Sequence, residues 1–250
     1  MPSREQRAAA ILMEQRLSLT PIQPLPSDLA PKNMTECYAI QSALNVMLTA
    51  AGLGDVVGHK IGCTTPVMQA FVNINHPATG RVFSKTVIHR HGHVRLSKDL
   101  PPKSAQFYTR EVVEDAVGEV MVGMELVDER YLDYRTLGVQ TLVADDFYNA
   151  GCVLGDPVKD WRHLDLANLT GRTWINDVEV ASGNSSLVMG NPRNALAWLA
   201  NTHAEHGLPG LKAGEFVLLG SVVQTQWLNA GDRVRIEVSG LGEARLDMGD

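Results

Sequence analysis

The sequence contains few of the residues that build metal clusters or disulfide frameworks. Among its 250 residues there are three cysteines, Cys37, Cys63 and Cys152, and no two of them form a C-x-x-C pair. Neither a zinc framework nor a disulfide scaffold is therefore indicated. A reduced, cytoplasmic setting is the simplest expectation for such a chain.

Long apolar runs and an excess of positive charge are also missing. No run approaches the length of a membrane span, and residues 1–17 lack the apolar core and the cleavage site of a signal peptide. The formal net charge of −6 argues against a nucleic-acid-binding surface, which is usually basic. We therefore expect neither a membrane nor a nucleic acid as a partner, and 44% hydrophobic residues indicate a globular protein.

Three common catalytic or nucleotide-binding motifs are absent as well. The chain has no G-x-S-x-G, no P-loop and no G-x-G-x-x-G element. Serine-hydrolase, nucleotide-binding and dinucleotide-binding functions therefore lack support from the sequence.

The hydrophobic pattern predicts a small helical region followed by a β-rich body. Helices are expected at residues 3–17 and about 35–51, joined by a proline-rich linker. Short segments punctuated by glycine and proline predict strands at 56–62, 81–83, 87–96, 124–127, 153–154, 172–175, 216–219, 233–238 and 243–247. Two further helices, at 109–121 and about 193–206, separate groups of strands, which favours an α+β fold over a doubly wound sheet. We expect a helical N-terminal cap at 1–54 and a β-rich catalytic body at 55–250.

A lysine between two glycines is the first candidate functional residue. Gly58, Lys60 and Gly62 share one face of the strand predicted at 56–62, because side chains alternate along a strand. Glycines on both sides leave room around the ammonium, an arrangement that weakens a strand and makes sense if something else fills the space. The alternative is an edge-strand lysine flanked by turn glycines, and spacing alone does not separate the two.

Glu125 is the second candidate, because it lies in the otherwise apolar segment 122–127. A buried carboxylate without a partner is costly, so Glu125 is expected to meet a lysine, an arginine or a metal ion. The structural alternative is a salt bridge to Arg130 or Arg110.

Three histidines and two short polar segments complete the candidates. His89, His91 and His93 would face one way on a strand and could bind a metal, although such runs are more often solvated. The paired acids Asp145 and Asp146 could cap backbone amides, the usual role, or orient a catalytic group, which makes Asp145 a candidate catalytic residue. The candidates for substrate binding are Ser185, in a loop at 182–186 whose amides could hold a carboxylate, and Ser221, at the end of a strand.

These motifs, in this order, resemble the fumarylacetoacetate hydrolase superfamily. The closer resemblance is to its branch of 2-keto-4-pentenoate (2-hydroxypentadienoate) hydratases and 4-oxalocrotonate decarboxylases. The resemblance covers nearly the whole chain and is carried by residues 58–64, 124–128, 144–151, 190–200, 211–221, 230–232 and 240–242.

The resemblance implies a fold of mixed sheets around a site that holds Mg²⁺ or Mn²⁺. It also implies a small-molecule substrate, a 2-oxo or 2-hydroxydienoic acid, and a homo-oligomer. Lys60 would polarise the substrate and manage protons. Glu125 would be the third of three metal-binding carboxylates, and the other two would form a Glu-x-Glu pair on one strand.

The sequence departs from this family pattern at the metal site. The Glu-x-Glu pair is not found, and the interval that should contain it looks short by about a strand. If residues 95–98 are kept in register, His89 and His91 fall where the two glutamates belong. Either these histidines replace the carboxylates or the metal site has been lost. In addition, Ala78-Thr79-Gly80 stands where hydratases often carry an aspartate.

The function implied by the resemblance is hydration in the catabolism of aromatic meta-cleavage products. Water would add to a 2-hydroxy-2,4-dienoate through its ketonised form and give a 4-hydroxy-2-oxo acid. One alternative is a decarboxylase that acts on a 2-oxo-3-enedioate. The other is a metal-poor, non-catalytic homologue that serves as a binding protein or partner subunit.

Overall fold

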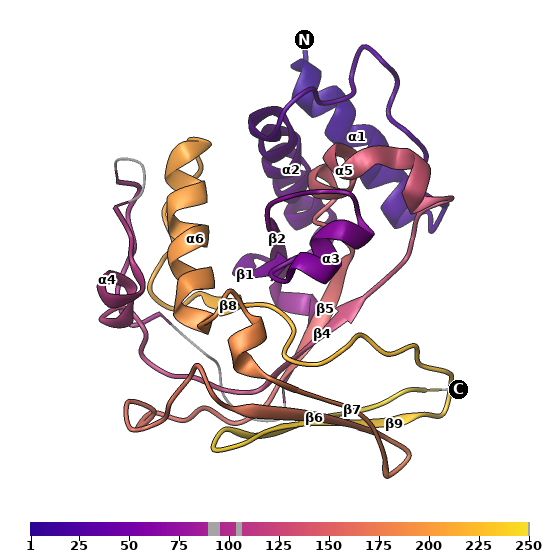
Figure 1. Ribbon diagram of the computed structural model, residues 1–250. Helices are drawn as coiled ribbons and strands as arrows, with labels where there is room; N and C mark the ends of the chain where they lie inside the picture. The colour runs from indigo at the N-terminus through magenta and orange to yellow at the C-terminus, as the bar shows by residue number, and fades with distance from the viewer. Residues whose placement is uncertain (90–95, 104–106, 250) are drawn as a thin grey trace.

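The computed structural model describes residues 1–89, 96–103 and 107–249, and it confirms the α+β class (Figure 1). Its helices are α1 (Arg4–Leu17), α2 (Met34–Leu48), α3 (Pro66–Phe71), α4 (Arg110–Glu114), α5 (Tyr134–Ala144) and α6 (Pro192–Glu205). Its strands are β1 (Val56–Gly62), β2 (Ala78–Phe83), β3 (Val87–His89), β4 (Gly123–Val127), β5 (Asn149–Leu154), β6 (Thr170–Ile175), β7 (Val178–Asn184), β8 (Phe216–Leu218), β9 (Arg233–Val238) and β10 (Gly242–Asp247).

The longer helices begin where side chains satisfy their first free amides. Ser3 forms a capping box with Gln6 at the start of α1, and the side chain of Asn33 accepts a hydrogen bond from the Glu36 amide at the start of α2. Asn191 caps α6, and Pro192 occupies its first turn, where a missing N–H costs nothing.

The described strands form three small sheets. Their orders are β2-β1-β8, β10-β9-β6-β7 and β3-β5-β4. In Figure 1 the four-stranded sheet lies at the bottom, α1, α2 and α5 gather at the top, and α6 stands to one side. Strand β1 is the middle strand of its sheet, antiparallel to β2 and parallel to β8.

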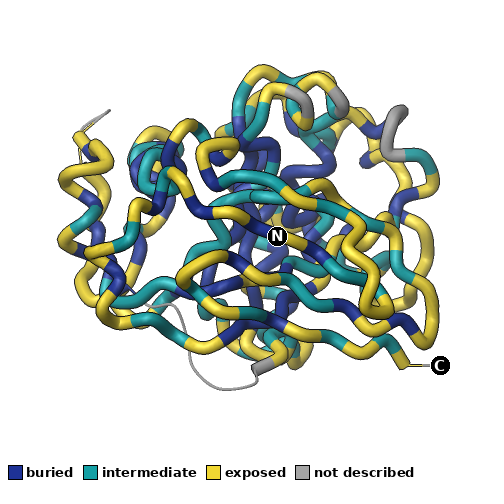
Figure 2. Tube along the Cα trace, turned by 60° about the horizontal axis from the view of Figure 1, so that its bottom comes forward, coloured by how far each residue is buried: buried dark blue, intermediate teal, exposed yellow. Residues whose placement is uncertain are grey.

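Two large apolar clusters meet at β1. One contains residues of α6 and of β9, and Ile61 of β1 packs in it. The other joins α1 and α2 to β2 and α5, and it includes Cys63 just beyond the end of β1. Figure 2 shows the buried segments concentrated in the interior of the trace. The predicted boundary near residue 54 stays a prediction, and the N-terminal helices share an apolar cluster with the body.

Several predicted elements have different extents in the structure. The helix expected at 109–121 ends at Glu114, because Val117 and Val120 instead form isolated bridges with Leu96 and Val158. The strand expected at 87–96 is seen as β3, and residues 90–95, which include His91 and His93, lie outside the described residues. The loop expected at 182–186 is in large part strand β7, which continues to Asn184. Helices α3 and α5 were not predicted.

The sequence predicted neither a membrane-spanning segment nor a disulfide scaffold. Within the described ranges, no helix has the length and apolar character needed to cross a membrane. All three cysteines are buried free thiols, as expected for a chain without a disulfide scaffold.

Candidate active site

An ion pair between Lys60 and Glu125 forms the centre of the candidate site. Lys60 Nζ lies 3.0 Å from Glu125 Oε1, and the Asn149 side-chain amide donates to the same oxygen at 3.2 Å. The Lys60 residue is 2% exposed, whereas the Glu125 side chain is 23% exposed. The partly buried carboxylate of Glu125 therefore pairs with a lysine on β1, and neither Arg130 nor Arg110 pairs with it. The carboxylate side of the pair is the side that faces solvent.

The space beside Lys60 is filled by two phenylalanine rings of the protein itself. A Cβ added to Gly58 would lie 2.9 Å from the Phe216 ring, and one added to Gly62 would lie 2.6 Å from the Phe147 ring. The Lys60 ammonium also lies over the Phe147 ring, 4.8 Å from its centroid, at a distance typical of a cation–π contact. The edge-strand alternative is wrong, because β1 pairs on both sides at Lys60, with Gly80 and with Leu218.

Phe147 reaches Lys60 because the turn that carries it is left-handed. Asp146, Phe147 and Tyr148 have φ values of 59°, 49° and 65°. Each such residue costs about 1 kcal/mol relative to the right-handed form, since its Cβ crowds the following carbonyl. The turn lies directly on β2, where a Cβ on Gly80 would be 2.5 Å from the Asp146 carbonyl oxygen. The glycines on β1 and β2 thus make room for this turn.

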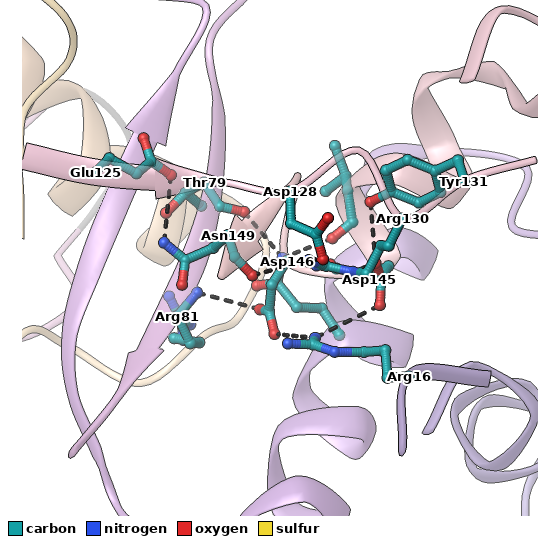
Figure 3. Close-up of polar contacts among 12 residues, drawn as sticks. Arg16, Thr79, Arg81, Glu125, Asp128, Arg130, Tyr131, Asp145, Asp146 and Asn149 are labelled. Atoms are coloured by element: carbon teal, nitrogen blue, oxygen red, sulfur yellow. Dashed lines mark hydrogen bonds and ion pairs between the residues drawn. The ribbon is translucent and has the colours of Figure 1, made fainter. Parts of the chain in front are cut away.

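Two fully buried aspartates anchor the same turn to α1 and to β2 (Figure 3). Asp146 accepts hydrogen bonds from the Arg81 backbone amide and from Arg16 Nη1, each at 3.1 Å. Burial raises the pKa of Asp146, and Arg16 opposes that rise. Arg16, 12% exposed at its side chain, is thereby a contact between α1 and the loop beside Lys60.

Asp145 is held by a different set of donors. Its carboxylate accepts from Arg130 Nε at 2.7 Å and from the Tyr131 hydroxyl at 2.9 Å, and Arg16 lies 3.5 Å away. Figure 3 shows Asp145 turned toward Arg130 and Tyr131, and Asp146 turned toward Arg16 and Arg81. The geometry suits a positioning role for Asp145, and its catalytic role stays a prediction.

On the face of the β1–β2 pair opposite Lys60, buried Arg81 of β2 lies between the imidazoles of His59 and His203. Arg81 Nη1 lies 2.7 Å from His59 Nδ1 and 3.1 Å from His203 Nε2. A guanidinium can only donate, so both ring nitrogens accept and both imidazoles are neutral. The other nitrogens then donate, from His59 to Glu215 at 3.1 Å and from His203 to the Pro209 carbonyl at 2.5 Å.

The two predicted substrate-binding serines lie in different places. Ser185 is buried, and its Oγ accepts the Leu169 amide at 2.8 Å, which ties the segment after β7 to the start of β6. Ser221 is exposed and donates to the Val223 carbonyl. Its neighbour Gly220 lies against Thr64, because a Cβ there would be 2.3 Å from the Thr64 hydroxyl. Ser221 is thus near the end of β1, and both assignments stay predictions.

The described residues do not supply a complete site for a divalent cation. The side chains that the structure describes contain no group of three or more histidines, cysteines, aspartates or glutamates that could hold a metal. Glu125 Oε1 already accepts from Lys60 and Asn149, whereas Mg²⁺ favours six oxygen ligands. His89 is placed only by its backbone, which pairs with Leu154, and His91 lies outside the described residues. The side chains that the structure describes around Glu125 therefore do not fit Mg²⁺ or Mn²⁺. The roles of Glu125, His89 and His91 as metal ligands stay predictions.

Sequence reasoning missed the aromatic and arginine side chains around the site. These are Phe147, Asn149, Arg16 and Arg81, which are all far in sequence from the residues they contact at the site. Phe147 and Asn149 lie in the segment 144–151 that carries the family resemblance, but neither was singled out as a candidate. The sequence did contain one signal for the 146–148 turn, namely the glycines at positions 62 and 80. A Cβ at either position would collide with this turn. A glycine on a central strand often marks such a close approach.

The arrangement supports proton transfer and binding of a small anion. Lys60 supplies an ammonium that can donate to a developing oxyanion, and Glu125 supplies a carboxylate that can accept a proton. Low solvent exposure around Lys60 strengthens each electrostatic interaction there.

Sequence relatives cover almost the entire chain. The chain is 31% identical to a 2-keto-4-pentenoate hydratase of Paraburkholderia xenovorans, over 98% of this chain and 95% of that protein. It is also 31% identical to a 2-hydroxyhexa-2,4-dienoate hydratase of Comamonas testosteroni, over 94% of each protein.

A solved structure and a family match agree with these relatives. The fold matches 4-oxalocrotonate decarboxylase of Pseudomonas putida, complexed with magnesium and adipate, with a TM-score of 0.87, 21% identity and 99% coverage of each chain. Residues 94–248 match the family described as fumarylacetoacetate (FAA) hydrolase C-terminal. Together with the full-length relatives, this match shows that the chain belongs to the fumarylacetoacetate hydrolase family, as the sequence motifs predicted.

Proposed function

We propose that the protein is a hydratase that adds water to a 2-hydroxy-2,4-dienoate and releases a 4-hydroxy-2-oxo acid. The observation that carries the proposal is the 3.0 Å contact between Lys60 Nζ and Glu125 Oε1 in a shielded position on the central strand. The relatives that share 31% identity over nearly the whole chain bear the names of hydratases of this substrate class.

Hydration of a 2-hydroxy-2,4-dienoate requires one group that stabilises an enolate and one group that transfers protons. Ketonisation of the dienol removes the proton of the 2-hydroxyl and adds a proton at C5, which leaves a C3=C4 double bond conjugated to the 2-oxo group. Water then adds across this bond, with the hydroxyl at C4 and a proton at C3. In our proposal Lys60 donates a hydrogen bond to the 2-oxygen when negative charge develops on it, and Glu125 accepts the proton released nearby.

Asn149 keeps the carboxylate in place during this sequence. Its amide donates to the same Glu125 oxygen that Lys60 contacts, so the carboxylate cannot rotate without breaking both interactions. The substrate approaches from the Glu125 side, where 23% of the side chain is exposed. We derive no step through a metal ion, because the described donor set does not fit one.

A substrate and metal panel tests the function. Purified protein is assayed with 2-hydroxypenta-2,4-dienoate and with 4-oxalocrotonate, each with EDTA, with Mg²⁺ and with Mn²⁺. We expect loss of the dienoate and formation of 4-hydroxy-2-oxopentanoate. Release of carbon dioxide from 4-oxalocrotonate without hydration would assign the chain to decarboxylation instead. No turnover of either substrate under any condition would favour a non-catalytic homologue that only binds such acids.

A further inference from the structure

We propose that Phe147 is a positioning residue, which holds the Lys60 ammonium against Glu125 during the reaction. The effect on turnover rests on the proposed function, whereas the effect on the Lys60 amine does not. The contacts of Phe147, the anchoring of its turn and the glycines beneath it carry the proposal.

The Phe147 ring restricts where the lysine head group can lie. The ring is 4% exposed and packs against Gly62, and its centroid lies 4.8 Å from Lys60 Nζ. Lysine has a flexible four-carbon stem, so an ammonium without such a neighbour samples several rotamers. The ring face attracts the cation and excludes water from that side.

The position of the ring is imposed by the fold and is not a local preference of the backbone. Three successive non-glycine residues, 146–148, have left-handed conformations, which persist only where their surroundings fix them. Asp146 supplies that fixation through Arg16 of α1 and the Arg81 amide of β2. The first N-terminal helix is therefore connected to Lys60 through Asp146 and the Phe147 ring.

Placement of this kind affects the chemical step more than substrate binding. A misplaced catalytic group loses rate steeply with distance, because reacting atoms must be held in a near-attack geometry. The Phe147 ring contacts Lys60 and is itself only 4% exposed, so we expect it to touch Lys60 and not the bound substrate. Loss of the ring should therefore lower kcat and leave KM nearly unchanged.

A volume swap separates positioning from simple packing. The Gly62→Ala variant adds a methyl group that would meet the Phe147 ring at 2.6 Å, and Phe147→Leu removes the ring. Each single variant should lower the Tm, and the double variant should recover it, because the smaller side chain admits the methyl group. We expect kcat of the double variant to stay about tenfold below wild type with KM unchanged, a loss of the size that a cation–π contact supports. Recovery of kcat together with the Tm would show that the ring only fills space and would overturn the proposal.

Competitive acetylation of lysine amines gives a second readout without any substrate. The rate at Lys60, followed by mass spectrometry, is compared with the rate at exposed Lys32 in the same sample. We expect the double variant to label Lys60 several-fold faster than wild type, and an unchanged rate would contradict the positioning role. If wild-type protein shows no turnover, the proposed function fails, and this labelling result still decides the role of Phe147.

Discussion

Arg16 Nη1 lies 3.1 Å from Asp146 Oδ2, and through this contact the first helix of the chain is bonded to the turn beside Lys60. The aspartate is completely buried and the arginine side chain is 12% exposed. Helix α1 therefore contributes directly to the arrangement of the candidate site, in addition to its apolar packing against α2.

Replacing Arg16 with methionine should destabilise the protein by about 3 kcal/mol. Breaking a buried ion pair leaves the other charge without compensation, and here Asp145 and Asp146 both lose a donor. Urea unfolding of Arg16→Met measures the change in the free energy of unfolding. Arg7, an exposed arginine on the same helix, is the control, and Arg7→Met should change that free energy by less than about 0.5 kcal/mol. Equal effects of the two variants would show that the buried contact is not important.

The stability of the protein should fall as the pH drops from about 6.5 to about 4. Burial lowers the pKa of His59 to about 4, and burial lowers the pKa of His203 well below its usual value, with Arg81 adding to both effects. Between these pH values the two histidines bind protons in the unfolded chain but stay neutral in the folded chain. The stabilisation present above pH 6.5 is therefore lost as the pH falls. Each histidine contributes a slope of up to about 1.4 kcal/mol per pH unit.

Urea unfolding at several pH values measures this slope. His163 is the control, because its side chain is 64% exposed, and His163→Gln should leave the slope unchanged. Nuclear magnetic resonance of the imidazole protons gives an independent check. If His59 and His203 titrate near pH 6.5 in the folded protein, the interpretation of two neutral imidazoles around Arg81 is wrong.

Replacing Glu125 with glutamine should reduce kcat about a hundredfold or more. The amide oxygen of glutamine can still accept a hydrogen bond from Lys60, but the carboxylate that accepts a proton is gone. Steady-state kinetics on 2-hydroxypenta-2,4-dienoate measure the loss, and the Tm checks that the fold persists. Glu129, an exposed glutamate just beyond β4, provides a matched control in Glu129→Gln. Wild-type turnover in Glu125→Gln would remove Glu125 from proton transfer.

The sequence predicted the parts of the fold that depend on local patterns. Strand β1 has the predicted bounds 56–62, and α1 and α6 lie within one or two residues of the predictions. The pattern failed where long-range pairing decides the structure. Segment 182–184 is polar and contains glycine, yet it is strand, because Gly183 pairs with Gly171 and lies under the Val222 carbonyl. Helix α5 contains Gly138 with φ of 69°, which obscures its helical period.

The sequence predicted which residues form the candidate site, but it did not predict which of them contact one another. Both Lys60 and Glu125 were candidates, and a cation for Glu125 was expected on grounds of burial alone. The choice of Lys60 as that cation depends on how β1 and β4 meet in space, and no local pattern encodes it. The same is true of Phe147, whose approach to Lys60 requires a left-handed turn and glycines on two different strands.

The most direct test of the central claim is the turnover of 2-hydroxypenta-2,4-dienoate by wild type and by Lys60→Ala. Both proteins are assayed side by side, and circular dichroism and the Tm confirm that the variant is folded. We predict that wild type forms 4-hydroxy-2-oxopentanoate and that Lys60→Ala retains less than about one hundredth of its kcat, as expected when a group that stabilises a developing oxyanion is removed. Undiminished turnover by a folded Lys60→Ala variant would contradict the assignment of Lys60 as the centre of the site.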